Sequence, residues 1–154
     1  MITKSSIFSW LQQHPVATVA TISKTYKPEL AVVYTNVDED FNCYFFTKES
    51  TRKYENLHRD KSITLAWFND LDLTTCEMAG DAFVVLDSAE ATSALIRLEA
   101  LMVNQQAEYW TPPVGQLEGS QYAIFRVIPR RVSFVDYSSA ATLDPEPEKL
   151  EFIP

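Results

Sequence analysis

Six short runs rich in β-branched and aromatic residues constrain the fold of this chain more than any other feature. The runs are Val16–Ile22, Leu30–Val37, Phe41–Thr47, Ile63–Phe68, Leu73–Leu86 and Tyr122–Val135. Such side chains are typical of strands, and short polar turns between most consecutive runs favour antiparallel pairing. The sequence therefore predicts a mainly β fold: six antiparallel strands in a closed or nearly closed β-barrel, with flanking helices packed at its ends.

Three helices are expected between these runs. Apolar spacing predicts a helix over Ser5–Gln13 and a second over Ser50–His58, with Ser50 as its N-cap. A third helix is expected to open at Asp87, followed by an alanine-rich run. Gly80 interrupts a long predicted strand, and we expect a bulge or bend there.

The length of 154 residues suits one domain, which we place at residues 1–136. Residues 137–154 combine prolines with acidic residues. That composition predicts an acidic C-terminal tail that is extended and weakly ordered.

The charge balance excludes several classes of partner. The chain has 13 Lys and Arg against 21 Asp and Glu, a net charge of -8, which argues against binding to nucleic acid or to an anionic membrane surface. No apolar run of membrane length and no signal-peptide pattern is present, so a cytoplasmic protein is expected. Cys43 and Cys76 stand alone, without the spacing of a zinc site, and are expected to be buried thiols; no metal site is predicted.

One basic segment stands out against the acidic background. Residues 48–61 hold five basic and three acidic residues, a local net charge of +2. Within the segment, the hydroxyls of Ser50 and Thr51 precede the adjacent cations Arg52 and Lys53 at a predicted strand-to-helix junction. Hydroxyls, free N–H groups at a helix start and cations are what a phosphate monoester needs. A solvated basic helix face would have the same composition.

Three motifs in this order resemble the pyridoxamine 5'-phosphate oxidase-like FMN-binding split-barrel family. They are Pro15–Thr21, Tyr44–Thr47 and Ser50–Leu57, and Phe125–Val132 is similar to the family's closing strand. The general stress protein-like branch fits best. The resemblance implies a six-stranded split barrel that forms a homodimer, with FMN bound at the subunit interface.

The resemblance also implies the cofactor-binding residues. Ser50, Thr51, Arg52 and Lys53 would surround the phosphate. Phe46 and Thr47 would lie along the ring and ribityl parts of the flavin. Thr75 occupies a position where the oxidase proper has a Gln that faces the flavin from the other subunit.

Two departures from the family pattern limit the activity that the resemblance implies. The second strand, Glu29–Tyr34, lacks the Arg and Lys that the oxidase carries there, and the C-terminal substrate cluster is missing. We therefore expect a flavin-dependent oxidoreductase that uses NAD(P)H and a small organic acceptor, not a true pyridoxamine-phosphate oxidase. The sequence names no catalytic residue.

The sequence also allows other interpretations of the function and the cofactor. A non-enzymatic split-barrel dimer could bind flavin or haem, or serve as a scaffold. Another flavin, a deazaflavin or haem could replace FMN, and His58 is the candidate ligand for a haem iron. His14 is expected at the end of the first helix rather than in a site.

Overall fold

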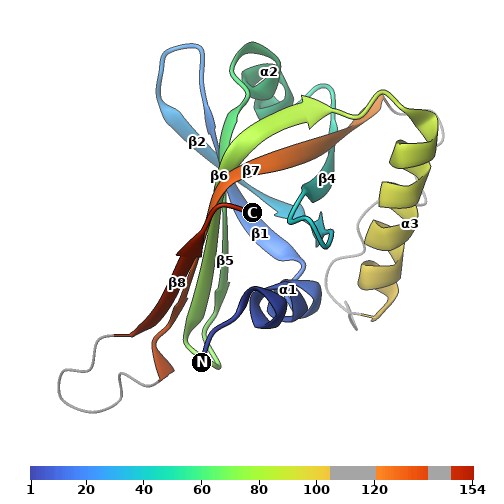
Figure 1. The fold of residues 1–154 in the computed structure, drawn as a ribbon. Helices are drawn as coiled ribbons and strands as arrows, with labels where there is room; N and C mark the ends of the chain where they lie inside the picture. Colours follow the sequence, from blue (N-terminus) through green and yellow to red (C-terminus); the bar gives the residue numbers. More distant parts are fainter. Residues whose placement is uncertain (105–120, 139–146) are drawn as a thin grey trace.

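The computed structural model describes residues 1–104, 121–138 and 147–154. Its helices are α1 (Lys4–Gln13), α2 (Arg52–Arg59) and α3 (Ser88–Asn104). Its strands are β1 (Val16–Ile22), β2 (Pro28–Tyr34), β3 (Asn36–Val37), β4 (Cys43–Lys48), β5 (Ser62–Asn69), β6 (Thr74–Val84), β7 (Tyr122–Asp136) and β8 (Glu148–Phe152) (Figure 1). Every predicted strand run and helix overlaps at least one of these elements. Residues 105–119, for which the sequence predicts no element, lie outside the described ranges.

The strands form one antiparallel sheet that curls into a barrel. Its order is β2-β1-β5-β6-β7-β4-β3, with β8 added to β7. The two ends of this order, β2 and β3, are separated in the chain only by Thr35. One bent segment therefore pairs with β1 through β2 and with β4 through β3. This arrangement confirms the mainly β class with flanking helices and an antiparallel barrel.

The bend between β2 and β3 is held by hydrogen bonds. The Thr35 amide and hydroxyl both donate to the Pro15 carbonyl, at 2.7 and 3.0 Å. The Trp67 indole N–H donates to the Thr35 hydroxyl at 3.1 Å. All of these groups are buried, so the polar atoms at the bend are satisfied inside the molecule.

The number of strands differs from the six expected. The predicted run Leu30–Val37 divides at Thr35 into β2 and β3, and β8 is additional. The bend divides the run because the chain stops pairing with β1 and begins pairing with β4. Period-2 alternation alone does not reveal such a change of partner strand.

The barrel interior is filled by alternate side chains of its strands. Trp67, Phe45, Phe125, Leu65 and Met78 are each at most 1% exposed. Burial raises the pKa of the Cys43 and Cys76 thiols, that of Cys76 to about 12. Both thiols are therefore protonated at neutral pH and serve as small core residues, as predicted.

The predicted irregularity at Gly80 is confirmed. The register between β6 and β7 shifts between Ala79 and Gly80. A Cβ at Gly80 would lie 2.4 Å from the Ile128 carbonyl oxygen, so only glycine allows the two strands to approach this closely.

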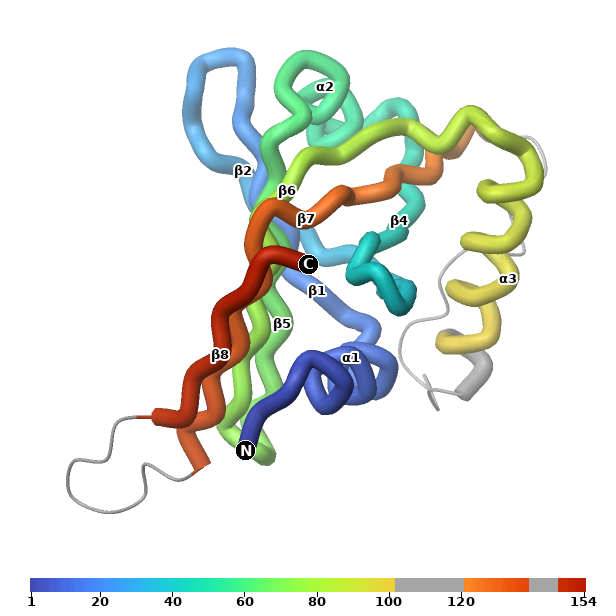
Figure 2. Tube along the Cα trace, viewed as in Figure 1, coloured from blue at the N-terminus to red at the C-terminus, as the bar shows by residue number. Residues whose placement is uncertain are grey.

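The helices cover the barrel. In Figures 1 and 2, α1 and α2 lie at opposite ends of the barrel. Ile7 of α1 and Leu57 of α2 are buried in the main core. The third helix, α3, packs through Ala94 against Tyr44 and Ile124. None of the helices in the described ranges has the length and apolar character needed to cross a membrane.

The C-terminal segment corrects one expectation. Residues 148–152 are not a weakly ordered tail: they form β8, which pairs with residues 132–136 of β7. The Phe152 ring lies 5.0 Å from the Phe41 ring, and the Lys4 ammonium lies 4.6 Å from the centre of the Phe152 ring. Phe152 and Leu150, which both pack against the core, therefore anchor a strand whose other three residues are charged. The part of the tail at 139–146 lies outside the described residues.

Candidate functional site

The turn between β4 and α2 is organised by two threonines. The Thr51 side chain accepts the Tyr54 amide at 3.4 Å and donates to the Lys48 carbonyl at 2.8 Å. The Thr47 and Thr51 hydroxyl oxygens are 2.9 Å apart. Thr51, not Ser50, is therefore the N-cap of α2, and the prediction for Ser50 is wrong. Ser50 instead stays exposed within the turn, because the Thr51 amide closes that turn on Lys48.

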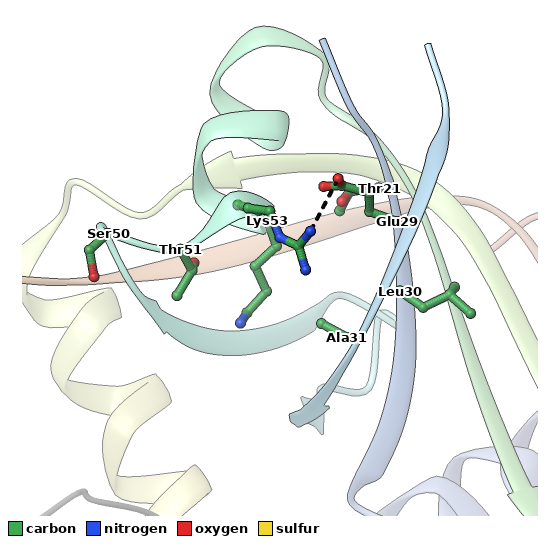
Figure 3. A pocket seen from close by; sticks show the side chains of 8 residues that line it. Thr21, Glu29, Leu30, Ala31, Ser50, Thr51 and Lys53 are labelled. Carbon is green, nitrogen blue, oxygen red and sulfur yellow. Dashed lines mark ion pairs between the residues drawn. The ribbon is translucent and has the colours of Figure 1, made fainter. Parts of the chain in front are cut away.

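A pocket of about 370 Å³ opens beside the start of α2. We call it the α2 pocket. It is lined by residues of β1, β2, the β4–α2 turn and the first turn of α2: Thr21, Glu29, Leu30, Ala31, Ser50, Thr51, Arg52 and Lys53 (Figure 3). The four predicted phosphate-binding residues thus share one pocket.

Glu29 is a pocket residue that sequence reasoning did not select. Its Oε1 lies 3.6 Å from Nη1 of Arg52. Its Oε2 accepts a hydrogen bond of 2.9 Å from Nδ2 of Asn56, which also donates to the Thr21 hydroxyl at 3.0 Å. Thr21 and Asn56 are buried, so this network fixes the Glu29 carboxylate at the edge of the pocket. The register of β1 with β2, which pairs Thr21 with Glu29, is the signal that could have revealed it.

Lys53 is the cation of the pocket that no carboxylate of the described residues balances. Figure 3 shows its side chain extending into the space below α2, away from the Arg52–Glu29 pair. Partial burial lowers the pKa of Lys53. Within the described part of the chain, Lys53 forms no ion pair, and an anionic ligand would relieve the cost of its burial.

A second groove adjoins the α2 pocket and shares Glu29 and Arg52 with it. Its volume is about 440 Å³, and its other lining residues are Ser23, Lys24, Thr25, Glu55, Asn56 and Arg59. The Arg59 guanidinium at its far side donates to the Ile22 carbonyl. We call it the adjoining groove.

The remaining predicted site residues lie elsewhere in the chain. Thr47 is buried and reaches the pocket only through its contact with Thr51. The Phe46 ring packs toward α3 and lies 6.0 Å from the Tyr122 ring. Thr75 lies on β6 between Phe68 and Val135, and does not line the α2 pocket. One chain therefore gathers Ser50, Thr51, Arg52 and Lys53, but not Phe46 or Thr75.

The two histidines differ in their surroundings. His14 is the C-cap of α1; its Nδ1 lies 2.7 Å from the Trp10 carbonyl and its Nε2 lies 2.8 Å from Nδ2 of Asn69. His58 is exposed on α2, with its ring 4.8 Å from that of Tyr54. Among the described residues, no group of three His, Cys, Asp or Glu side chains is placed to hold a metal ion.

Comparison with solved structures finds the same fold in several bacterial proteins. A conserved hypothetical protein of Mycobacterium tuberculosis is 17% identical, with a TM-score of 0.75 over 95% of this chain and 92% of that chain. A heme binding protein of Mycobacterium smegmatis is 14% identical, with a TM-score of 0.74 over 99% of this chain and 59% of that chain. General Stress Protein 26 of Bacillus anthracis is 18% identical, with a TM-score of 0.65 over 96% of this chain and 98% of that chain. At these identities the likeness extends to the fold alone.

Comparison by sequence identifies the family. No curated protein matches the sequence significantly. A family model described as pyridoxamine 5'-phosphate oxidase matches residues 4–136, from the start of α1 to the end of β7. The match covers most of the chain and includes every element that lines the α2 pocket. The chain therefore belongs to the pyridoxamine 5'-phosphate oxidase family.

Proposed function

We propose that this chain binds FMN, with the flavin phosphate in the α2 pocket, and acts as a flavin-dependent oxidoreductase. NAD(P)H would be the electron donor and a small organic molecule the acceptor. The observation that carries the proposal is Lys53: a half-buried lysine without a carboxylate partner in the described residues, beside an exposed Ser50 hydroxyl and the Arg52 guanidinium.

The donors of the pocket fit a phosphate monoester. Lys53 supplies a charge that needs an anion, and Ser50 supplies a hydroxyl. Arg52 is 81% exposed in its side chain and can turn from Glu29 toward a ligand. The Thr51 hydroxyl already donates to Lys48, so Thr51 positions α2 rather than donating to the phosphate. When bound, the isoalloxazine ring would supply the hydride and electron transfer.

An exposed apolar face supports a homodimer. We define this apolar face by Val16, Leu30, Val32, Ala66 and Phe68, all exposed on β1, β2 and β5. Leu30, Val32 and Phe68 are 70%, 55% and 66% exposed. Apolar side chains gathered this way on a sheet mark an interface rather than a solvated surface.

The apolar face also connects the two groups of predicted site residues. Leu30 at one end of the face lines the α2 pocket, and Phe68 at the other end pairs with Thr75. A twofold axis that crosses the middle of such a face, perpendicular to its long direction, would bring one end of the face on one protomer toward the opposite end on its partner. This geometry supports the expectation that Thr75 faces the flavin of the partner subunit.

The test is an absorption spectrum of the purified protein after incubation with FMN and gel filtration, followed by NAD(P)H oxidation with a panel of acceptors. Retained flavin bands at the dimer position, with turnover in the presence of an acceptor, are expected. A protein that elutes without flavin at saturating FMN would contradict the cofactor assignment.

A second candidate function is flavin binding without redox activity, and the Arg52–Glu29 ion pair favours it. That pair engages one of the two cations of the pocket with an internal carboxylate. Flavin that is retained but never reduced by NAD(P)H is the result that separates this candidate from the oxidoreductase. Haem is a further molecule to test for binding. If the protein binds haem and its Soret band persists in His58→Ala, His58 is not the ligand of the haem iron.

A further inference from the structure

We propose that Glu29 is a specificity-determining residue of the α2 pocket: its carboxylate competes with a phosphate group for Arg52. The preference of the pocket for FMN over riboflavin, the same flavin without a phosphate, is then smaller than it would be without the Glu29 carboxylate. This inference rests on the proposed function, because it concerns the ligand of the same pocket.

The position of the carboxylate is the first observation. Glu29 and Arg52 both line the α2 pocket, and Oε1 of Glu29 lies 3.6 Å from Nη1 of Arg52. The dashed line at Glu29 in Figure 3 marks this ion pair. A phosphate that binds Arg52 must therefore either displace this carboxylate or accept a like charge beside it.

The rigidity of the carboxylate is the second observation. Nδ2 of the buried Asn56 donates to Oε2 of Glu29 at 2.9 Å and to the Thr21 hydroxyl at 3.0 Å. The Glu29 side chain is 30% exposed, whereas that of Arg52 is 81% exposed. The anion is therefore the fixed member of the pair and the cation is the mobile one, so Glu29 does not simply move aside when a ligand enters.

The charged residues that line the α2 pocket do not fully neutralise a phosphate. Arg52 and Lys53 contribute two positive charges and Glu29 one negative charge. A phosphate monoester carries a charge near -2 at neutral pH, and neutralising it takes both cations. With Glu29 in place, only Lys53 is available without competition.

The experiment compares three proteins: the wild type, Glu29→Gln and Glu55→Gln. Glutamine keeps the length of the side chain and an oxygen that accepts from Asn56, so the network around Thr21 is retained. Glu55 is the matched control, because it is exposed on α2 and lines the adjoining groove but not the α2 pocket, and its substitution by Gln removes the same charge. Calorimetric titrations with FMN, riboflavin and inorganic phosphate give the affinities.

Glu29→Gln is expected to bind FMN about ten-fold more tightly than the wild type, and riboflavin within two-fold of it. Glu55→Gln is expected to change the FMN affinity less than three-fold. Equal changes for FMN and riboflavin in Glu29→Gln, or equal gains of FMN affinity in Glu29→Gln and Glu55→Gln, would overturn the proposal.

Inorganic phosphate separates this inference from the proposed function. If no variant binds either flavin but Glu29→Gln binds phosphate more tightly than the wild type, the flavin assignment fails and the role of Glu29 stands. If the wild type and Glu29→Gln bind inorganic phosphate with the same affinity, the proposed role of Glu29 is wrong, whatever the flavin titrations show.

A second comparison measures the coupling between Glu29 and Arg52 directly. Arg52→Gln should weaken FMN binding less than three-fold in the wild type, where Glu29 engages the guanidinium. The same substitution should weaken it about ten-fold in the Glu29→Gln background. Equal losses in both backgrounds would mean that the two side chains act independently.

Discussion

Lys53 and Glu29 place opposite charges in the α2 pocket, and their surroundings differ. Glu29 has a buried amide and a guanidinium as partners, whereas Lys53 forms no ion pair with any residue that the structure describes. Burial without a counter-charge lowers the pKa of Lys53, because the charged form loses hydration that nothing replaces. A phosphate would replace that hydration, so Lys53 couples ligand binding to pH.

The affinity for FMN should fall as the pH rises from 7 to about 10. Only the protonated lysine attracts the phosphate, and Lys53 loses its proton at lower pH than an ordinary lysine because its pKa is lowered. Lys53→Arg should flatten this decline, since a guanidinium stays charged over the whole range. Titrations at several pH values check this.

Lys61→Arg is the control for the pH experiment, because Lys61 is exposed and lies outside the pocket. The FMN affinity of Lys61→Arg should fall with rising pH as that of the wild type does. If the FMN affinity falls equally with pH in the wild type and in Lys53→Arg, Lys53 is not the titrating group.

The sequence alone predicts only those pocket residues that are consecutive in the chain. Ser50–Lys53 form one short motif, whose composition indicates an anion site. Glu29 and Thr21 come from two other strands, and they meet α2 only through the register of β1 with β2 and the reach of Asn56. A motif search cannot find such a contact, because it depends on the packing of a helix on a hairpin.

The strands with many β-branched residues could be predicted from their composition, whereas β3 and β8 could not. Two residues are too few for a periodic pattern, and β3 exists because Thr35 bends the chain from β1 toward β4. The strand β8 alternates Lys149, Leu150, Glu151 and Phe152, but neighbouring prolines and acids hide that alternation. Its pairing with β7 depends on long-range contacts that local composition does not encode.

Phe152→Ala should lower the free energy of unfolding by about 1–2 kcal/mol, because the ring is only partly buried. The substitution removes the contacts of the ring with Phe41 and with the Lys4 ammonium. Urea unfolding followed by circular dichroism measures the change. Ile153→Ala, at a neighbouring side chain that is 77% exposed, should change the stability by less than about 0.5 kcal/mol. Equal effects of the two substitutions would mean that Phe152 does not anchor β8.

At the scale of the whole molecule, the barrel presents one uncharged side that α1, α2 and α3 leave uncovered. The register places Val32 and Ala66 on either side of the exposed Thr18, so this apolar face extends across three strands with one hydroxyl between its apolar side chains. A homodimer built on it would border both α2 pockets through Leu30. Flavin binding and dimer formation should then be linked.

Val32→Glu should raise the dissociation constant of the dimer at least ten-fold, because two like charges would meet across a twofold axis. The side chain is 55% exposed in the single chain, so the fold itself should tolerate the change. Sedimentation velocity over a range of concentrations measures the dissociation. Leu86→Glu, at a side chain that is 90% exposed and outside the apolar face, should leave it unchanged. A monomeric wild type, or a Val32→Glu dimer as stable as the wild type, would contradict this interface.

The most direct test of the central claim is the FMN affinity of the Arg52→Gln/Lys53→Gln double variant. The control is Lys27→Gln/Lys61→Gln, which removes the same charge from exposed positions outside the α2 pocket. The pocket variant should bind FMN at least ten-fold more weakly than the wild type, and the control should bind within three-fold of it. Equal affinities of the pocket variant and the control would show that the flavin phosphate does not bind in the α2 pocket.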